Sequence, residues 1–99
     1  MKNQPNQTGR AVLVTTQFRG VFFGYVVDES KLPNEITLAR ARNAISWAAS
    51  VGGFLGLAST GVNSECKIGS CVEDEELRLF SITSVTGVTE AAAKTWESA

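Results

Sequence analysis

The residues best suited to binding chemistry lie in one short stretch near the middle of the chain. Arg40, Arg42, Asn43 and Trp47 lie close together, and a glycine-rich segment that includes Gly53 follows them. A guanidinium group can bind a phosphate or carboxylate through two parallel hydrogen bonds, and it can stack on a ring. Tryptophan offers an aromatic platform, and asparagine can hydrogen-bond the edge of a base. These five residues therefore predict a site for a small anionic, nucleotide-like ligand.

The competing interpretation of the same cluster is structural. The arginines would then pair with the acidic residues 73–76, and Trp47 would pack in the hydrophobic core. Asn43 and Trp47 are four residues apart, so they share a face whether the segment is a helix or a strand. The sequence leaves open whether that shared face meets a ligand or the core.

Small residues dominate the segment 50–61, which offers a second way to bind an anion. Exposed N–H groups at the start of a helix attract negative charge, and Gly52 and Gly53 precede a predicted helix. The spacing does not match a phosphate-binding loop, because no Gly-Lys-Ser/Thr follows, and it does not match the dinucleotide-binding pattern. The alternative is that these glycines form turns and allow close packing between subunits.

Catalytic and metal-binding side chains are scarce. The chain has no histidine and two cysteines, Cys66 and Cys71. Two thiols alone do not complete a zinc site, and reduced thiols are expected in a cytoplasm. The acidic run 73–76 lacks the ligand spacing of an EF-hand loop. The sequence therefore predicts a protein that is not an enzyme and that has neither a cofactor nor a metal.

Charge and composition limit the classes of partner that this chain is expected to bind. The 99 residues contain 43% hydrophobic and 19% charged side chains, with a net charge of −1, so a single globular domain is expected. A chain without excess positive charge has no broad field for nucleic acid, which makes nucleic-acid binding unlikely. Near-zero net charge also opposes self-association only weakly, and a homo-oligomer is expected.

The N-terminal residues 1–9 are polar and are predicted to form a disordered arm. They contain no apolar segment typical of a secretory signal. No apolar stretch approaches the roughly 20 residues that a membrane-spanning helix needs. A cytoplasmic location without a membrane partner is therefore expected.

The first half of the chain is predicted to begin with a β-hairpin. Residues 10–16 and 21–27 are rich in β-branched and aromatic side chains, which favour strands. Residues 17–20 form a plausible connection between them. Gly24, inside the second strand, indicates a bulge or a close approach of another backbone.

The segment that contains the candidate site has an ambiguous pattern. Its apolar residues fit both a helical spacing and the alternation of a strand. We favour short strands at 36–38 and 44–48 with a turn over 39–43. The alternative is a single helix over 37–49.

The second half is predicted to contain two further strands and a helix. Residues 53–60 form a short helix that Gly61 ends. Residues 66–72 form one strand, and residues 77–88 form the longest strand, with a bend at Gly87.

The clearest helix is predicted at residues 90–97. Thr89 is suited to the N-cap position, and Trp96 is expected to anchor the helix on the sheet. The predicted fold is therefore a single α+β domain over residues 10–99. It has a mostly antiparallel β-sheet, a short internal helix and a C-terminal helix.

The sequence resembles a group of small, functionally uncharacterised proteins of phage and prophage genomes. The matching positions are 11–16, 19–22, Leu38, 41–43, Trp47, Gly53, 56–58, Gly61, 68–69 and 91–96. Members often have proline after the glycine that matches Gly61, where this chain has Val62. The resemblance implies a viral accessory protein in the host cytoplasm, without a defined activity or site.

Two functions follow as hypotheses. The first is a non-enzymatic phage-type accessory protein that binds a small nucleotide-like ligand, for example as a sponge for a nucleotide signal of host defence. The second is a structural or protein-interaction module, such as a capping, coat or inhibitor protein, that binds a host protein through its apolar surface.

Overall fold

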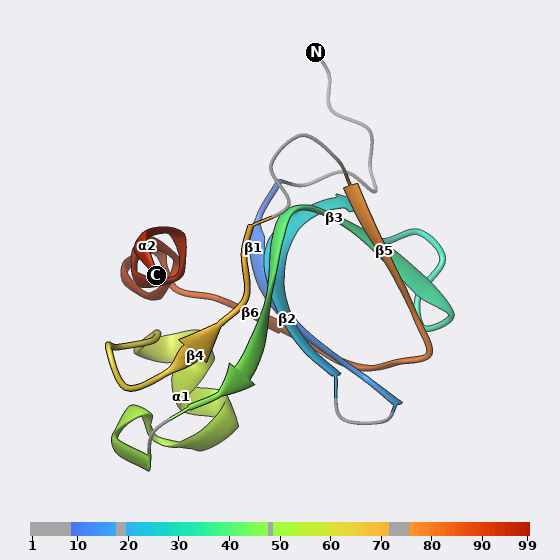
Figure 1. The fold of residues 1–99 in the computed structure, drawn as a ribbon. Coiled ribbons are helices and arrows are strands. Elements are labelled where there is room, and N and C mark those ends of the chain that lie inside the picture. The colour runs from blue at the N-terminus through green and yellow to red at the C-terminus, as the bar shows by residue number, and fades with distance from the viewer. Residues whose placement is uncertain (1–8, 18–19, 48, 72–75) are drawn as a thin grey trace.

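The chain forms one curled antiparallel sheet with helices packed on its outer side (Figure 1). The structure is a computed structural model and describes residues 9–17, 20–47, 49–71 and 76–99. The elements in chain order are β1 (Ala11–Thr16), β2 (Gly20–Asp28), β3 (Glu35–Ser46), η2 (Ala49–Val51), α1 (Gly53–Ser59), β4 (Lys67–Ile68), β5 (Glu76–Phe80), β6 (Ile82–Gly87) and α2 (Glu90–Ser98).

The order of the strands explains the curl. The sheet runs β4-β3-β2-β1-β6, and β5 pairs with β3 beside β4. β5 and β6 are consecutive in the chain, yet they lie on opposite edges of the sheet. The sheet must therefore bend back on itself to bring its two edges together at one corner (Figure 1).

Ser81 is that corner. It has a left-handed backbone conformation with φ of 57°, and it separates β5 from β6. Its N–H donates to the carbonyl of Asn34, and its carbonyl accepts from the N–H of Gln17, both at 3.0 Å. These hydrogen bonds attach the corner to the β1–β2 and β2–β3 connections, and they offset the cost of the unusual backbone.

Side chains along each strand point alternately to the two faces of the sheet, and apolar side chains on both faces form two hydrophobic cores. In β1, Leu13 faces one core while Val12 and Val14 face the other. The helix-side core contains Leu13, Val21, Phe23, Val51, Leu57, Ala58, Val62, Ala93 and Trp96. The inner core contains Val12, Val14, Val26, Ile36, Leu38, Ala41 and Leu79.

Helix α2 closes the helix-side core. Thr89 caps it, because its side chain accepts a hydrogen bond from the N–H of Ala92 at 3.1 Å. Trp96 is fully buried, stacks on Phe23 with ring centroids 5.1 Å apart, and donates its indole N–H to the carbonyl of Leu57 at 3.1 Å.

The predicted fold class is confirmed. The sheet is antiparallel throughout, with α1 inside the chain and α2 at its C-terminal end. The predicted bulge at Gly24 is also present, since the β2–β3 register shifts between Phe23 and Tyr25. A Cβ atom at Gly24 would lie 2.9 Å from the Cβ of Leu38, which explains why a residue without a side chain stands there.

The central prediction for residues 36–48 was wrong in detail. β3 is one strand over Glu35–Ser46, in place of two strands joined by a turn or of a helix over 37–49. The turn expected over 39–43 reduces to a single irregularity at Arg40, where φ is 54°. Pairing with β2 and β5 holds the strand in place on both sides of that point, and such pairing outweighs local preference.

Two strands of the second half also differ from the prediction. Among the described residues, the strand expected over 66–72 is limited to Lys67–Ile68, and the strand expected over 77–88 divides at Ser81, not at Gly87. Cys66 and Cys71 are free thiols. The predicted arm over residues 1–9 lies outside the described residues except for Gly9, whose N–H donates to the carbonyl of Val26 at 3.0 Å. Within the described part of the chain, no helix is long and apolar enough to cross a membrane.

Candidate functional site

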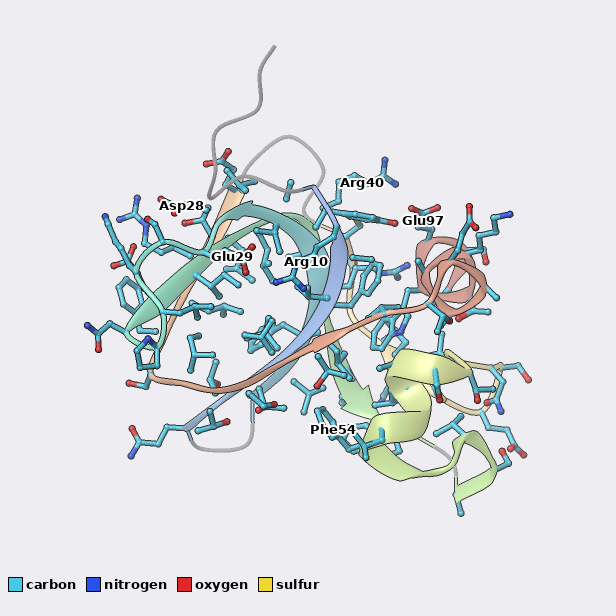
Figure 2. All side chains as sticks on the ribbon, turned by 180° about the vertical axis from the view of Figure 1, so that it is seen from behind. Arg10, Asp28, Glu29, Arg40, Phe54 and Glu97 are labelled. Carbon is cyan, nitrogen blue, oxygen red and sulfur yellow. The ribbon has the colours of Figure 1, made fainter. Side chains whose placement is uncertain are left out.

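The five residues predicted to bind a ligand are spread from β3 through Trp47, which follows it, to the start of α1. Arg40 is exposed, and it forms no salt bridge with any described residue. Gly53 is the first residue of α1 and is exposed, with φ of 76°. Figure 2 shows Arg40 at one end of the molecule and Phe54, the neighbour of Gly53, at the other. The two ends of the predicted cluster therefore do not meet.

Arg42 is half-buried, and two of its guanidinium nitrogens bind backbone. Its Nε donates to the carbonyl of Gly69, and its Nη1 donates to the carbonyl of Trp96, each at 2.8 Å. The carbonyl of Trp96 lies in the last turn of α2, where the helix dipole favours a positive charge. Arg42 thus joins β3 to the segment after β4 and to the end of α2.

Asn43 and Trp47 have different surroundings from Arg42. Successive residues of a strand point to opposite faces, so Asn43 lies on the other face of β3 from Arg42, and it is exposed. Trp47 is half-buried and packs against the helix-side core. The structure therefore does not bring Arg42, Asn43 and Trp47 together around one ligand.

A cavity of about 550 Å³ lies between the segment that follows α1 and the last turns of α2. A volume of this size is typical of small-molecule sites. Its lining residues are Val62, Asn63, Ser64, Cys66, Ile68, Thr95, Ser98 and Ala99. They come from two parts of the chain about 30 residues apart, so no local motif in the sequence could reveal the cavity.

Short polar contacts fix the walls of this cavity. Thr95 Oγ1 accepts from the N–H of Val62 at 2.9 Å and donates to the carbonyl of Ala92 at 2.6 Å. Asn63 Oδ1 accepts from the N–H of Glu65 at 2.9 Å and from the thiol of Cys66 at 3.5 Å. These contacts order both walls of the cavity, which is open to solvent because half of its lining residues are exposed.

Arg42 binds both walls of the cavity, although it is not itself a lining residue. Gly69 follows directly after β4, whose Ile68 lines the cavity, and Trp96 lies between the lining residues Thr95 and Ser98. By holding both carbonyls, one guanidinium fixes the distance between the walls. The sequence predicted that Arg42 binds a ligand, whereas its contacts in the structure are those of a positioning residue.

The electrostatics of the cavity oppose an anion. None of the described residues that line it carries a charged side chain. The C-terminal turn of α2, which carries the negative end of the helix dipole, forms one wall. The hydroxyls of Ser64, Thr95 and Ser98 stand beside the apolar side chains of Val62 and Ile68. This combination suits a small ligand with polar but uncharged groups.

A second cavity, of about 400 Å³, lies on the other side of α2. Its lining residues are Ala11, Tyr25, Val88, Glu90, Ala93, Lys94 and Glu97. The hydroxyl of Tyr25 donates to the carboxylate of Glu97, and the positive charge of Arg40 acts on Tyr25 in the opposite sense. Burial, followed by the hydrogen bond and charge of Glu97, raises the pKa of Tyr25 to about 12.

The raised pKa predicts a loss of stability in strong alkali. Since the folded pKa lies above the ordinary value of about 10, the folded state favours the neutral phenol. The resulting stabilisation is complete below about pH 10 and disappears as pH rises through about 12. Urea denaturation across this range should show the loss, and Tyr25→Phe should reduce it. Because Tyr25 is the only tyrosine, the ultraviolet absorbance of phenolate reports its titration directly. An unshifted titration of the folded protein would contradict the prediction.

Within the described residues, no group of three or more His, Cys, Asp or Glu side chains could hold a metal ion. The half-buried thiol of Cys66 donates to an amide oxygen, and no basic side chain is among the lining residues beside it. Such an arrangement lacks the partner that activates a nucleophilic cysteine.

The protein is thus a small curled α+β domain with a cavity beside its C-terminal helix. The chain belongs to the family described as a domain of unknown function, DUF6948, whose model matches residues 9–96. No curated protein and no solved structure matches the chain. The family description gives no activity, and the expected kinship with phage proteins stays a prediction.

Proposed function

We propose that this protein is a non-enzymatic binding protein that holds a small, polar, uncharged ligand in the cavity between residues 62–68 and the end of α2. The observation that carries the proposal is the preformed cavity of about 550 Å³, whose two walls Arg42 fixes through the carbonyls of Gly69 and Trp96. A site whose walls are already ordered loses little conformational entropy when a ligand binds.

The ligand class differs from the anionic ligand that the sequence suggested. A phosphate would need a guanidinium in the cavity, but Arg42 is not among the lining residues, and two of its three guanidinium nitrogens bind backbone carbonyls. Arg40 is not among the residues that line the cavity. The lining contains three hydroxyls and no charged side chain, which favours groups such as sugar hydroxyls or amides instead.

The two cysteines allow a direct test. Cys66 lines the cavity and Cys71 does not, so any occupant should slow alkylation of Cys66 relative to Cys71. The purified protein is treated with iodoacetamide in buffer and in a small-molecule extract of the expressing cells, and each thiol is followed by mass spectrometry. We expect selective protection of Cys66 by the extract, together with a retained mass in native mass spectrometry.

Matched variants connect the protection to the cavity. Ser64→Trp places a large side chain in the cavity, whereas Ser70→Trp adds the same side chain at an exposed position outside its lining. Ser64→Trp should abolish the retained mass and Ser70→Trp should keep it. Equal retention by both variants, or equal alkylation of both thiols in every condition, would contradict the proposal.

A pair of probes separates the two ligand classes. Adenosine and adenosine monophosphate differ only in the phosphate, and each is titrated against the protein while alkylation of Cys66 is measured. A charge-free cavity should favour adenosine over the monophosphate. Stronger protection by the monophosphate, lost in Arg40→Ala, would return support to the anionic ligand.

A further inference from the structure

The two edges of the sheet differ sharply in charge. The edge formed by β4 and β5 carries Lys67, Glu76 and Arg78, and Arg78 Nε lies 3.6 Å from a carboxylate oxygen of Glu35. The other edge is β6, and the segment 79–89 around it contains neither a charged residue nor a proline. Charged side chains and proline are the usual means by which an edge strand avoids pairing with another chain. The β6 edge lacks both.

The register of β6 shows which backbone groups are unpaired. The N–H of Val88 donates to the carbonyl of Ala11 at 3.0 Å, and the β1–β6 register is regular from Gly87 to Ser84. In an antiparallel pair, alternate residues direct their N–H and C=O groups toward the neighbouring strand. Val88, Thr86 and Ser84 therefore face β1, while Val85 and Gly87 direct their backbone groups away from it. No described strand pairs with that side of β6.

We propose that β6 pairs in antiparallel fashion with β6 of a second copy of this chain. A two-fold axis near Thr86 would place Val85 opposite Gly87 of the second copy and the reverse, so that all four outward groups on each strand are used. The two Thr86 side chains would then lie directly opposite each other, a pairing that is favourable across strands. The pairing would end near Thr83, because a register shift between Thr15 and Thr16 disturbs β6 there.

A second copy fits this edge better than an unrelated protein. Partners of different sequence are usually selected and oriented by complementary charge, and this strand offers none. Two copies of this uncharged strand meet without repulsion between charged side chains. The net charge of −1 on each chain adds little repulsion. Because the pairing strand is short, the association is expected to be reversible and dependent on concentration.

The test places one charge on the edge. A Cβ atom at Gly87 would meet nothing within 4 Å, and its φ is not left-handed, so Gly87→Lys should preserve the monomer. Ile45→Lys is the matched control, since it adds the same charge and removes a side chain that is 56% exposed on β3. Sedimentation is measured over a wide range of protein concentration. The parent and Ile45→Lys should approach twice the mass of 10.6 kDa, while Gly87→Lys should remain a monomer.

Amide hydrogen exchange gives a second, independent result. The amides of Thr86 and Val88 should be protected at every concentration, whereas those of Val85 and Gly87 should gain protection only as the dimer forms. A monomer at all concentrations would overturn the proposal. A dimer whose Val85 and Gly87 amides stay unprotected would also overturn it, as would protection of both amides in a monomer, which would mean that the same chain covers the edge.

Discussion

Replacement of Trp96 by alanine is expected to lower the free energy of unfolding by about 3–5 kcal/mol. Trp96 is fully buried, stacks on Phe23 with an angle of 3° between the rings, and binds the carbonyl of Leu57. Its loss leaves a large cavity between α2 and the sheet and removes the partner of a buried carbonyl. Small domains have a total stability of about 5–15 kcal/mol, so the variant should be close to unfolding at room temperature. Urea denaturation followed by circular dichroism measures the change.

A conservative variant separates the two contributions of Trp96. Trp96→Phe retains an aromatic ring against Phe23 but cannot donate to the carbonyl of Leu57. We expect it to lie between the parent and Trp96→Ala. Trp47, which is half-buried, remains as a fluorescent reporter in both variants. If Trp96→Ala cost less than about 1 kcal/mol, the residue would not anchor the helix-side core.

Much of this fold could be predicted because its signals are local. The β1–β2 hairpin follows from two runs of β-branched and aromatic residues separated by a short connection. Helix α2 follows from Thr89, whose side chain accepts from the N–H of Ala92, and from Trp96 on its buried face. The signals for these features lie within a few positions of one another, so they can be recognised from the sequence alone, although the contacts of Trp96 with Phe23 and Leu57 are distant in the chain.

The features that escaped prediction depend on residues far apart in the chain. Arg40 and Ser81 both have left-handed backbones, although neither is glycine. The corner at Ser81 is held by Asn34 and Gln17, which are distant in sequence, so alternation over 77–88 gave no sign of it. Likewise, β3 is continuous because strands on both sides pair with it.

The candidate site shows the same limit. The cluster around Arg42 drew attention because its residue types suit ligand binding, yet type alone does not say whether a donor is free. Two backbone carbonyls, one in the segment after β4 and one in α2, accept hydrogen bonds from two of its three guanidinium nitrogens. The cavity residues Ser64 and Thr95 gave no signal, because serine and threonine are common and their meeting is a product of tertiary structure.

The main effect expected of Arg42→Ala is therefore a lower free energy of unfolding, and any loss of binding would follow from it. A buried hydrogen bond from a charged donor contributes about 1.5–3 kcal/mol, and Arg42 makes two. Because the side chain is only half-buried, solvent weakens both bonds, and we expect a loss of about 2–3 kcal/mol in urea denaturation. Arg40→Ala is the matched control, because Arg40 is exposed and pairs with no described residue in a salt bridge; it should change stability by less than about 0.5 kcal/mol.

Arg42→Ala and Arg42→Lys together show whether Arg42 positions the cavity walls or binds the ligand itself. A positioning residue holds the cavity walls together, so its removal should also speed alkylation of Cys66 under native conditions. Arg42→Lys keeps the charge but cannot reach both carbonyls with one fork, and it should show an intermediate loss of stability. If Arg42 instead bound an anionic ligand directly, Arg42→Ala would leave stability and the reactivity of Cys66 unchanged and would abolish retention of the ligand. A stable Arg42→Ala variant without bound ligand would thus show that the ligand binds to Arg42 on β3 and not in the cavity.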